Sequence, residues 1–95
     1  MFNHIVLFKA KNTATKTEIG AALESLEKLL EEVVEVKTWS VSKVLSMRPS
    51  PYDYVQFSVF DNVKGMDQYR HHPRHEQVKA KLKQVFDYEV VDFEA

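Results

Sequence analysis

Residues 2–10 read Phe-Asn-His-Ile-Val-Leu-Phe-Lys-Ala, a run of β-branched and aromatic side chains that predicts a β-strand. Successive side chains of a strand point to opposite faces, so the residues of this strand divide into two sets. One face carries Phe2, His4, Val6 and Phe8, and the other carries Ile5 and Leu7. Because its middle is apolar on both faces, the strand needs cover on both faces.

A helix is predicted shortly after this strand. Thr15 and Glu18 have the spacing of a capping box, in which the threonine side chain accepts from an early backbone N–H and the glutamate reaches back to the cap. Apolar residues then recur at steps of three and four, which indicates one amphipathic helix with a single buried face. That face consists of Ile19, Ala22, Leu23, Leu26, Leu29, Leu30 and Val33.

Two more strands follow, separated by a loop with two prolines. The segment 34–44 is rich in valine, but its apolar phase slips by one residue near Ser42, which predicts a β-bulge there. Trp39 lies on this strand, and we expect its large ring in an interface between subunits. Residues 45–51 form the loop, and residues 52–60 alternate as a third strand.

The last third of the chain predicts two helices and a fourth strand. An Asp-Asn pair at residues 61–62 can cap a short helix, and Pro73 interrupts the helical pattern at residues 70–72. We expect a final helix from about residue 74 to residue 85, and then a strand over residues 88–93.

This order of elements predicts an α+β fold, with a ferredoxin-like four-stranded antiparallel sheet and helices on one face. We expect residues 1–95 to form one domain. The other sheet face would expose a larger apolar patch than soluble monomers tolerate. We therefore expect a homodimer through the exposed sheet face, a dimeric alpha-beta barrel. Alternatively, loop 45–51 could fold over the exposed sheet face, but this is less favoured because the loop is short and polar.

The composition argues against several classes of protein. The 13 Lys and Arg residues nearly balance the 14 Asp and Glu residues, so no net charge attracts nucleic acid or an anionic membrane. Cysteine is absent, which excludes disulfides, catalytic thiols and cysteine-based metal sites. The sequence has no signal-peptide pattern and no apolar run of about 20 residues. We expect a cytoplasmic protein with no nucleic-acid and no membrane partner.

Four segments together resemble the stress-responsive alpha-beta barrel (Dabb) family. They are residues 3–9, 54–60, 69–75 and 91–94, and the sharpest signal is the motif Tyr-x-x-His-Pro-x-His in the third. The resemblance covers nearly the whole chain and implies a dimeric α+β barrel. More distantly, the sequence is similar to olivetolic acid cyclase, a plant polyketide cyclase that catalyses an intramolecular aldol cyclisation.

The resemblance also implies a site for a small hydrophobic or carbonyl-bearing ligand. By motif, His75 and Tyr69 take the positions of the catalytic His and Tyr of the cyclase, and His4 that of a pocket His. We accordingly predict His75 and Tyr69 as catalytic, and His4, Tyr54 and His72 as substrate-binding. Imidazole titrates near neutrality, so His75 can act as the base and the Tyr69 hydroxyl as the donor, with no metal or other cofactor required.

Other roles for these residues stay open at this level. His75 could cap the final helix while Tyr69 packs under the sheet, and His4 could be a core histidine bonded to a carboxylate or a backbone group. The histidines at 71, 72 and 75 have a spacing that can bind a metal, but Pro73 interrupts their helix. The basic residues between 70 and 83 are expected on a solvated helix face rather than in an anion or RNA site. The alternative functions are a non-catalytic, stress-associated structural or binding dimer, and a cofactor-free monooxygenase on the same fold.

Overall fold

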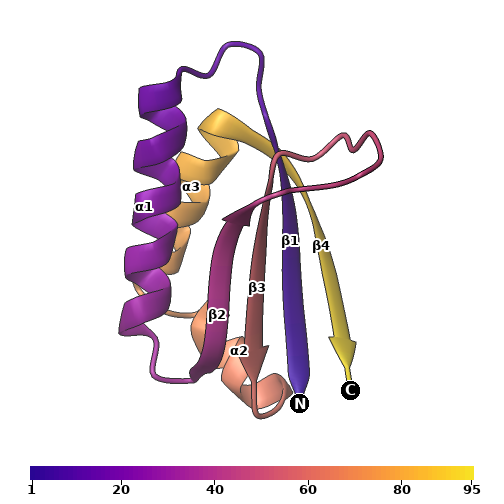
Figure 1. Ribbon diagram of the computed structural model, residues 1–95. Helices are drawn as coiled ribbons and strands as arrows, with labels where there is room; N and C mark the ends of the chain where they lie inside the picture. Colours follow the sequence, from indigo (N-terminus) through magenta and orange to yellow (C-terminus); the bar gives the residue numbers. More distant parts are fainter.

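The computed structural model describes all residues, 1–95, as a sheet of four strands covered on one face by helices (Figure 1). The strand order is β2-β3-β1-β4, and every neighbouring pair is antiparallel. This arrangement confirms the predicted α+β ferredoxin-like fold. Along the chain the elements are β1 (Phe2–Ala10), α1 (Lys16–Glu32), β2 (Val36–Lys43), β3 (Tyr54–Phe60), α2 (Val63–Arg70), α3 (His75–Val85) and β4 (Phe86–Glu94).

Helix α1 begins with the predicted capping box. The Oγ1 atom of Thr15 accepts a hydrogen bond from the backbone N–H of Glu18 (3.1 Å), and a carboxylate oxygen of Glu18 accepts one from the N–H of Thr15 (2.9 Å). A cap of this kind contributes about 1 kcal/mol to stability. Neither α1 nor the shorter helices are long and apolar enough to cross a membrane. The innermost residues of α1 are at most 1% exposed, namely Ala22, Leu26, Leu29 and Leu30.

The core between helices and sheet is built around three phenylalanines from three strands. Phe8, Phe60 and Phe86 are each at most 1% exposed, and the rings of Phe8 and Phe86 lie 5.1 Å apart between centroids. Burying a side chain of this size stabilises the fold by about 1.5 to 3 kcal/mol. These contacts hold β1, β3 and β4 firmly under the helices, and the polar residues of the candidate site lie on the same sheet face.

Strand β2 differs from the prediction in two respects. Its β-bulge lies between Val36 and Thr38 and not near Ser42, because the rest of the strand pairs with β3 without interruption. Trp39 pairs with Ser58 and packs against the core on the helix-covered face, so its expected place in a subunit interface is wrong. The irregularity at the start of the strand sets the register, and a shift of one residue moves every side chain to the other face.

The last third of the chain follows the prediction, apart from the start of the final strand. A side-chain oxygen of Asn62 accepts from the backbone N–H of Gly65 (3.1 Å) and caps α2. Pro73 lies in the break between α2 and α3. Strand β4 begins at Phe86, two residues earlier than predicted, because the chain passes from α3 directly into the sheet and Phe86 enters the core.

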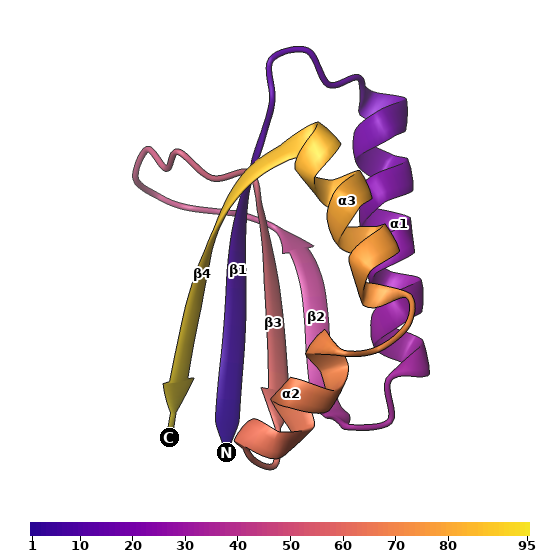
Figure 2. The same ribbon diagram turned by 180° about the vertical axis from the view of Figure 1, so that it is seen from behind.

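The face of the sheet opposite the helices is uncovered, as the two ribbon views show (Figures 1 and 2). On this face Phe57 is 40% exposed, Val91 47% and Phe93 44%. The loop between β2 and β3 projects to the side away from the helices, and its Leu45 and Met47 are 91% and 106% exposed. These two side chains make no cover for the sheet, so the outer face of the single chain remains apolar and open.

Candidate active site

A cavity of about 440 Å³ lies between helices α2 and α3 and the helix-covered face of the sheet. Of the 19 residues that line it, 12 are hydrophobic. Sites for small ligands commonly combine such an apolar wall with a few convergent polar groups. The polar side chains therefore determine which chemistry the cavity supports. The apolar wall includes Phe2, Val6, Leu29, Met66, Val78 and Leu82.

Tyr69 lies between two histidines on the wall of this cavity. Its ring centroid is 6.2 Å from that of His4 and 5.0 Å from that of His75, and both pairs meet edge to face. Burial raises the pKa of the Tyr69 hydroxyl, and a hydrogen bond with the Gln56 side chain acts in the opposite direction. The phenol therefore keeps its proton at neutral pH and can donate a hydrogen bond. The structure thus brings together three of the five predicted site residues, from β1, α2 and α3.

His75 is the first residue of α3, and it has no partner for one of its ring nitrogens. Its Nδ1 atom is buried and makes no hydrogen bond. Helix α3 has no side-chain cap, so the alternative role of His75 as a capping residue is not found. Burial lowers the pKa of His75, nearby Glu76 raises it, and the positive charges of Lys79 and Arg70 lower it further, as does His4. The imidazole is therefore neutral at pH 7 and has a free lone pair.

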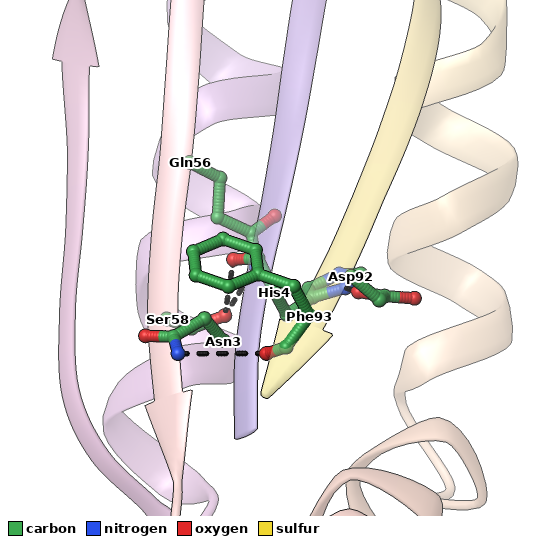
Figure 3. A network of polar contacts seen from close by, with 6 residues as sticks. All are labelled: Asn3, His4, Gln56, Ser58, Asp92 and Phe93. Atoms are coloured by element: carbon green, nitrogen blue, oxygen red, sulfur yellow. Dashed lines mark hydrogen bonds and ion pairs between the residues drawn. The ribbon is translucent and has the colours of Figure 1, made fainter. Parts of the chain in front are cut away.

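His4 is held by a carboxylate from the neighbouring strand. Its Nδ1 atom lies 2.5 Å from Oδ1 of Asp92, because β1 and β4 pair in a register that places the two residues side by side (Figure 3). On the other side, the Oγ atom of Ser58 donates to the His4 carbonyl oxygen (3.3 Å). A hydrogen bond with the Asp92 carboxylate requires a hydrogen on Nδ1, so Nε2 is the ring nitrogen that remains for a ligand. Sequence reasoning allowed a carboxylate partner for His4 but did not identify Asp92.

Tyr54, one of the predicted substrate-binding residues, does not line the cavity. It lies on the helix-covered side of β3 opposite Phe8, whereas His4 lies opposite Ser58. Four residues of strand span about 13 Å. The Tyr54 ring packs instead against Phe86, with centroids 5.9 Å apart. The core phenylalanines therefore separate Tyr54 from the site.

The three histidines around Pro73 have different environments. His71 is exposed, and its Nδ1 donates to the carbonyl oxygen of Asp67 (2.8 Å). The Nδ1 of His72 accepts from the backbone N–H of Arg74 (3.2 Å), so His72 shapes the turn between α2 and α3 and does not line the cavity as predicted. No group of three or more histidine, aspartate or glutamate side chains is placed to hold a metal ion.

The contact between His4 and Asp92 leads to a prediction about stability. In Asp92→Asn a neutral amide oxygen replaces the carboxylate, so the charge-assisted part of the hydrogen bond is lost. We expect the free energy of unfolding to fall by about 1 kcal/mol, measured by urea denaturation. The matched control is Glu94→Gln, on the same strand and opposite Phe2, where we expect a change near zero. Equal effects of the two substitutions would show that the carboxylate does not hold His4.

Comparison with known proteins agrees with this architecture. The Stress responsive A/B Barrel Domain (Dabb) family matches residues 2–95. An uncharacterized protein of Streptomyces coelicolor, SCO4036, is 26% identical over 96 residues, which cover 99% of each chain. A dimeric ferredoxin-like protein of unknown function from Thermobifida fusca is 25% identical, with a TM-score of 0.87 over 99% of this chain and 90% of that one. A hydroxynitrile lyase from Passiflora edulis shares the fold at 16% identity, with a TM-score of 0.86 over 97% and 90% of the two chains. The chain belongs to the stress responsive A/B barrel domain (Dabb) family.

Proposed function

We propose that the protein binds a small, mostly apolar carbonyl compound in the cavity and acts on it as a cofactor-free lyase or cyclase. His75 is the general base and the Tyr69 hydroxyl is the hydrogen-bond donor. One observation carries this proposal: His4, Tyr69 and His75 meet on one wall of a cavity that is otherwise mainly apolar. The hydroxynitrile lyase with the same fold supports it at the level of architecture only.

The proposed reaction begins with removal of a proton from the carbon next to the carbonyl group. The C–H bond breaks, the proton goes to the imidazole of His75, and the electron pair moves to the carbonyl oxygen to form an enolate. Because Nδ1 of His75 is buried, Nε2 is the atom available to the ligand. The Tyr69 hydroxyl stabilises the negative oxygen by a hydrogen bond, which is strong in a cavity of low polarity. The enolate carbon then attacks a second carbonyl of the same molecule, and the proton returns to the new alkoxide.

His4 and Asp92 extend this machinery by positioning. The carboxylate fixes the tautomer and the ring orientation of His4, whose Nε2 lone pair can accept a hydrogen bond from a ligand hydroxyl or from the enol. Substrate binding by His4 is thus part of the proposal. The reverse of the bond-forming step cleaves a carbon–carbon bond, so one set of residues serves lyase and cyclase chemistry alike.

The proposal includes a homodimer that covers the outer face of the sheet. Phe57, Val91 and Phe93 give this face an apolar surface that a second copy can bury. The Thermobifida fusca protein with the same fold is described as dimeric. In this arrangement the two sheets face each other, and the two cavities lie on the outer sides.

The function is tested with small ketones and β-dicarbonyl compounds in D₂O. NMR measures how fast the hydrogens on the carbon next to the carbonyl group are replaced by deuterium. Exchange faster than the buffer rate supports the proposal. Binding without any exchange across the series would favour the non-catalytic binding dimer.

The role of Tyr69 gives a prediction for this assay. Tyr69→Phe keeps the ring but removes the donor, so we expect the exchange rate to fall by about 10²-fold, the usual effect of deleting one oxyanion donor. Tyr54→Phe is the matched control, because Tyr54 lies outside the cavity, and we expect it to keep the wild-type rate. A Tyr69→Phe protein with full activity would remove Tyr69 from the mechanism.

A further inference from the structure

The basic residues between positions 70 and 83 are exposed or half-buried, as expected for a solvated face, but they differ in their contacts. Arg74 makes an ion pair with Glu32, and Lys81 donates to the Oγ of Ser25 (3.2 Å). Arg70 and Lys79 line the cavity. Neither forms an ion pair, and neither side chain donates a hydrogen bond. Two cations without partners thus lie at a largely apolar cavity.

Both cations are close to the reactive wall. Arg70 directly follows Tyr69 at the end of α2, and Lys79 lies four residues after His75, on the same side of α3. Their charges also act on the His75 ring, as the lowering of its pKa by both shows. A ligand that reaches His75 and Tyr69 therefore also lies within the field of two positive charges.

The acidic residues that line the cavity form no ion pair with these cations. Asp92 holds His4, and the carboxylate of Asp67 faces the ring of His71, with 3.6 Å between Oδ1 and Nδ1. Glu76 lies in the first turn of α3 but is not among the lining residues. Each lining carboxylate thus has a histidine beside it, whereas the guanidinium and the ammonium are open to a ligand.

We infer that the ligand of the proposed active site carries a carboxylate, which binds between Arg70 and Lys79. This inference rests on the proposed function and names its substrate class: a small carbonyl compound with an apolar body and one anionic end. A guanidinium binds a carboxylate through two parallel hydrogen bonds, and the ammonium adds a second charge. The apolar body then lies against the hydrophobic wall, and the carbonyl group reaches His75 and Tyr69.

The test uses two probes of equal shape, β-benzoylpropionate and its neutral amide, β-benzoylpropionamide. Isothermal titration calorimetry on the full chain measures both dissociation constants at neutral pH. We expect the acid to bind about tenfold more tightly than the amide, and we expect added salt to reduce the difference. In Arg70→Gln/Lys79→Gln the two constants should become equal within about twofold, with amide binding unchanged. Lys83→Gln, which removes a charge from the same helix outside the cavity, should keep the tenfold preference.

Proton exchange next to the ketone of each probe separates this inference from the proposed function. Exchange of both probes with no preference for the acid would overturn the inference and leave the function standing. A preference that persists in the double variant would also overturn it. A preference that disappears in the double variant, with no exchange of either probe, would support the carboxylate site and contradict the catalytic role. If neither probe binds, both proposals fail.

Discussion

His75→Gln is expected to lower the rate of proton exchange by at least about 10²-fold, because a general base in contact with the substrate contributes this much or more. Glutamine is close to histidine in size and fills the same position, but its amide does not accept a proton at neutral pH. His75 makes no hydrogen bond through Nδ1, so no native hydrogen bond at that atom is lost. We therefore expect the thermal melting temperature to stay within about 2 °C of the wild-type value.

The pH dependence gives this prediction a second readout. Burial and the neighbouring positive charges lower the pKa of His75 below its ordinary value of 6.5. Below that lowered pKa the ring is protonated and cannot accept a proton, and above it the ring is the free base. The value of kcat/KM should therefore rise with pH through a midpoint below 6.5 and then stay level. The residual activity of His75→Gln should lack this rise.

The control for His75 is His71→Gln. His71 is exposed and is not among the residues that line the cavity, so the control should keep both the rate and the pH profile. Two results would count against the assignment of the base. A collapse of the melting temperature in His75→Gln would show that His75 is structural, and an unchanged exchange rate would show that another group removes the proton.

Local signals were sufficient to predict most of the fold from the sequence. The capping box of Thr15 and Glu18 sets the start of α1, and its periodic apolar residues identify the side that is buried. Pro73 interrupts the helical pattern, and α2 and α3 are separate helices in the structure. In each case the signal lies within a few residues of its effect, so no knowledge of tertiary contacts was needed.

Features that depend on strand register could not be predicted in the same way. Val36 and Trp39 read as apolar residues of one strand, but the face that each takes follows from where the bulge lies, which only pairing with β3 determines. The contact between His4 and Asp92 spans 88 positions in the sequence and arises from the register of β1 against β4. Nothing in the sequence around Asp92 indicates that its carboxylate contacts a histidine at the other end of the chain.

In the candidate site, too, local features could be predicted and tertiary contacts could not. Tyr69 and His75 belong to one short motif, and the turn shaped by His72 brings their rings to 5.0 Å. Tyr54 was predicted to bind substrate because the family resemblance includes its segment of the chain. Such a resemblance gives the position of a residue on a strand but not the packing around it. The core ring of Phe86 occupies the space beside Tyr54, and this packing is a tertiary contact that the sequence of β3 does not report.

Phe57→Glu is expected to convert the protein from a dimer into a monomer. Phe57 lies at the centre of β3 on the uncovered sheet face, and its pairing partner Ile5 lies on the same face. In a dimer through this face, the substitution would bury a carboxylate without a partner in an apolar interface, and the two-fold symmetry would introduce it twice. Burial of an unpaired charge costs several kcal/mol, so we expect the dimer to dissociate.

The measurement for Phe57→Glu is sedimentation equilibrium. The wild type should give twice the chain mass of 11.1 kDa, and the variant should give the chain mass itself. Gln84→Glu adds the same charge at an exposed position on α3, far from the sheet face, and should remain dimeric. A wild-type protein that sediments as a monomer in dilute solution would contradict the dimer directly, and a dimeric Phe57→Glu would place the interface elsewhere. All residues that line the cavity belong to one chain. A monomeric variant that still binds the ketone probes would therefore also show that each chain holds a complete binding site.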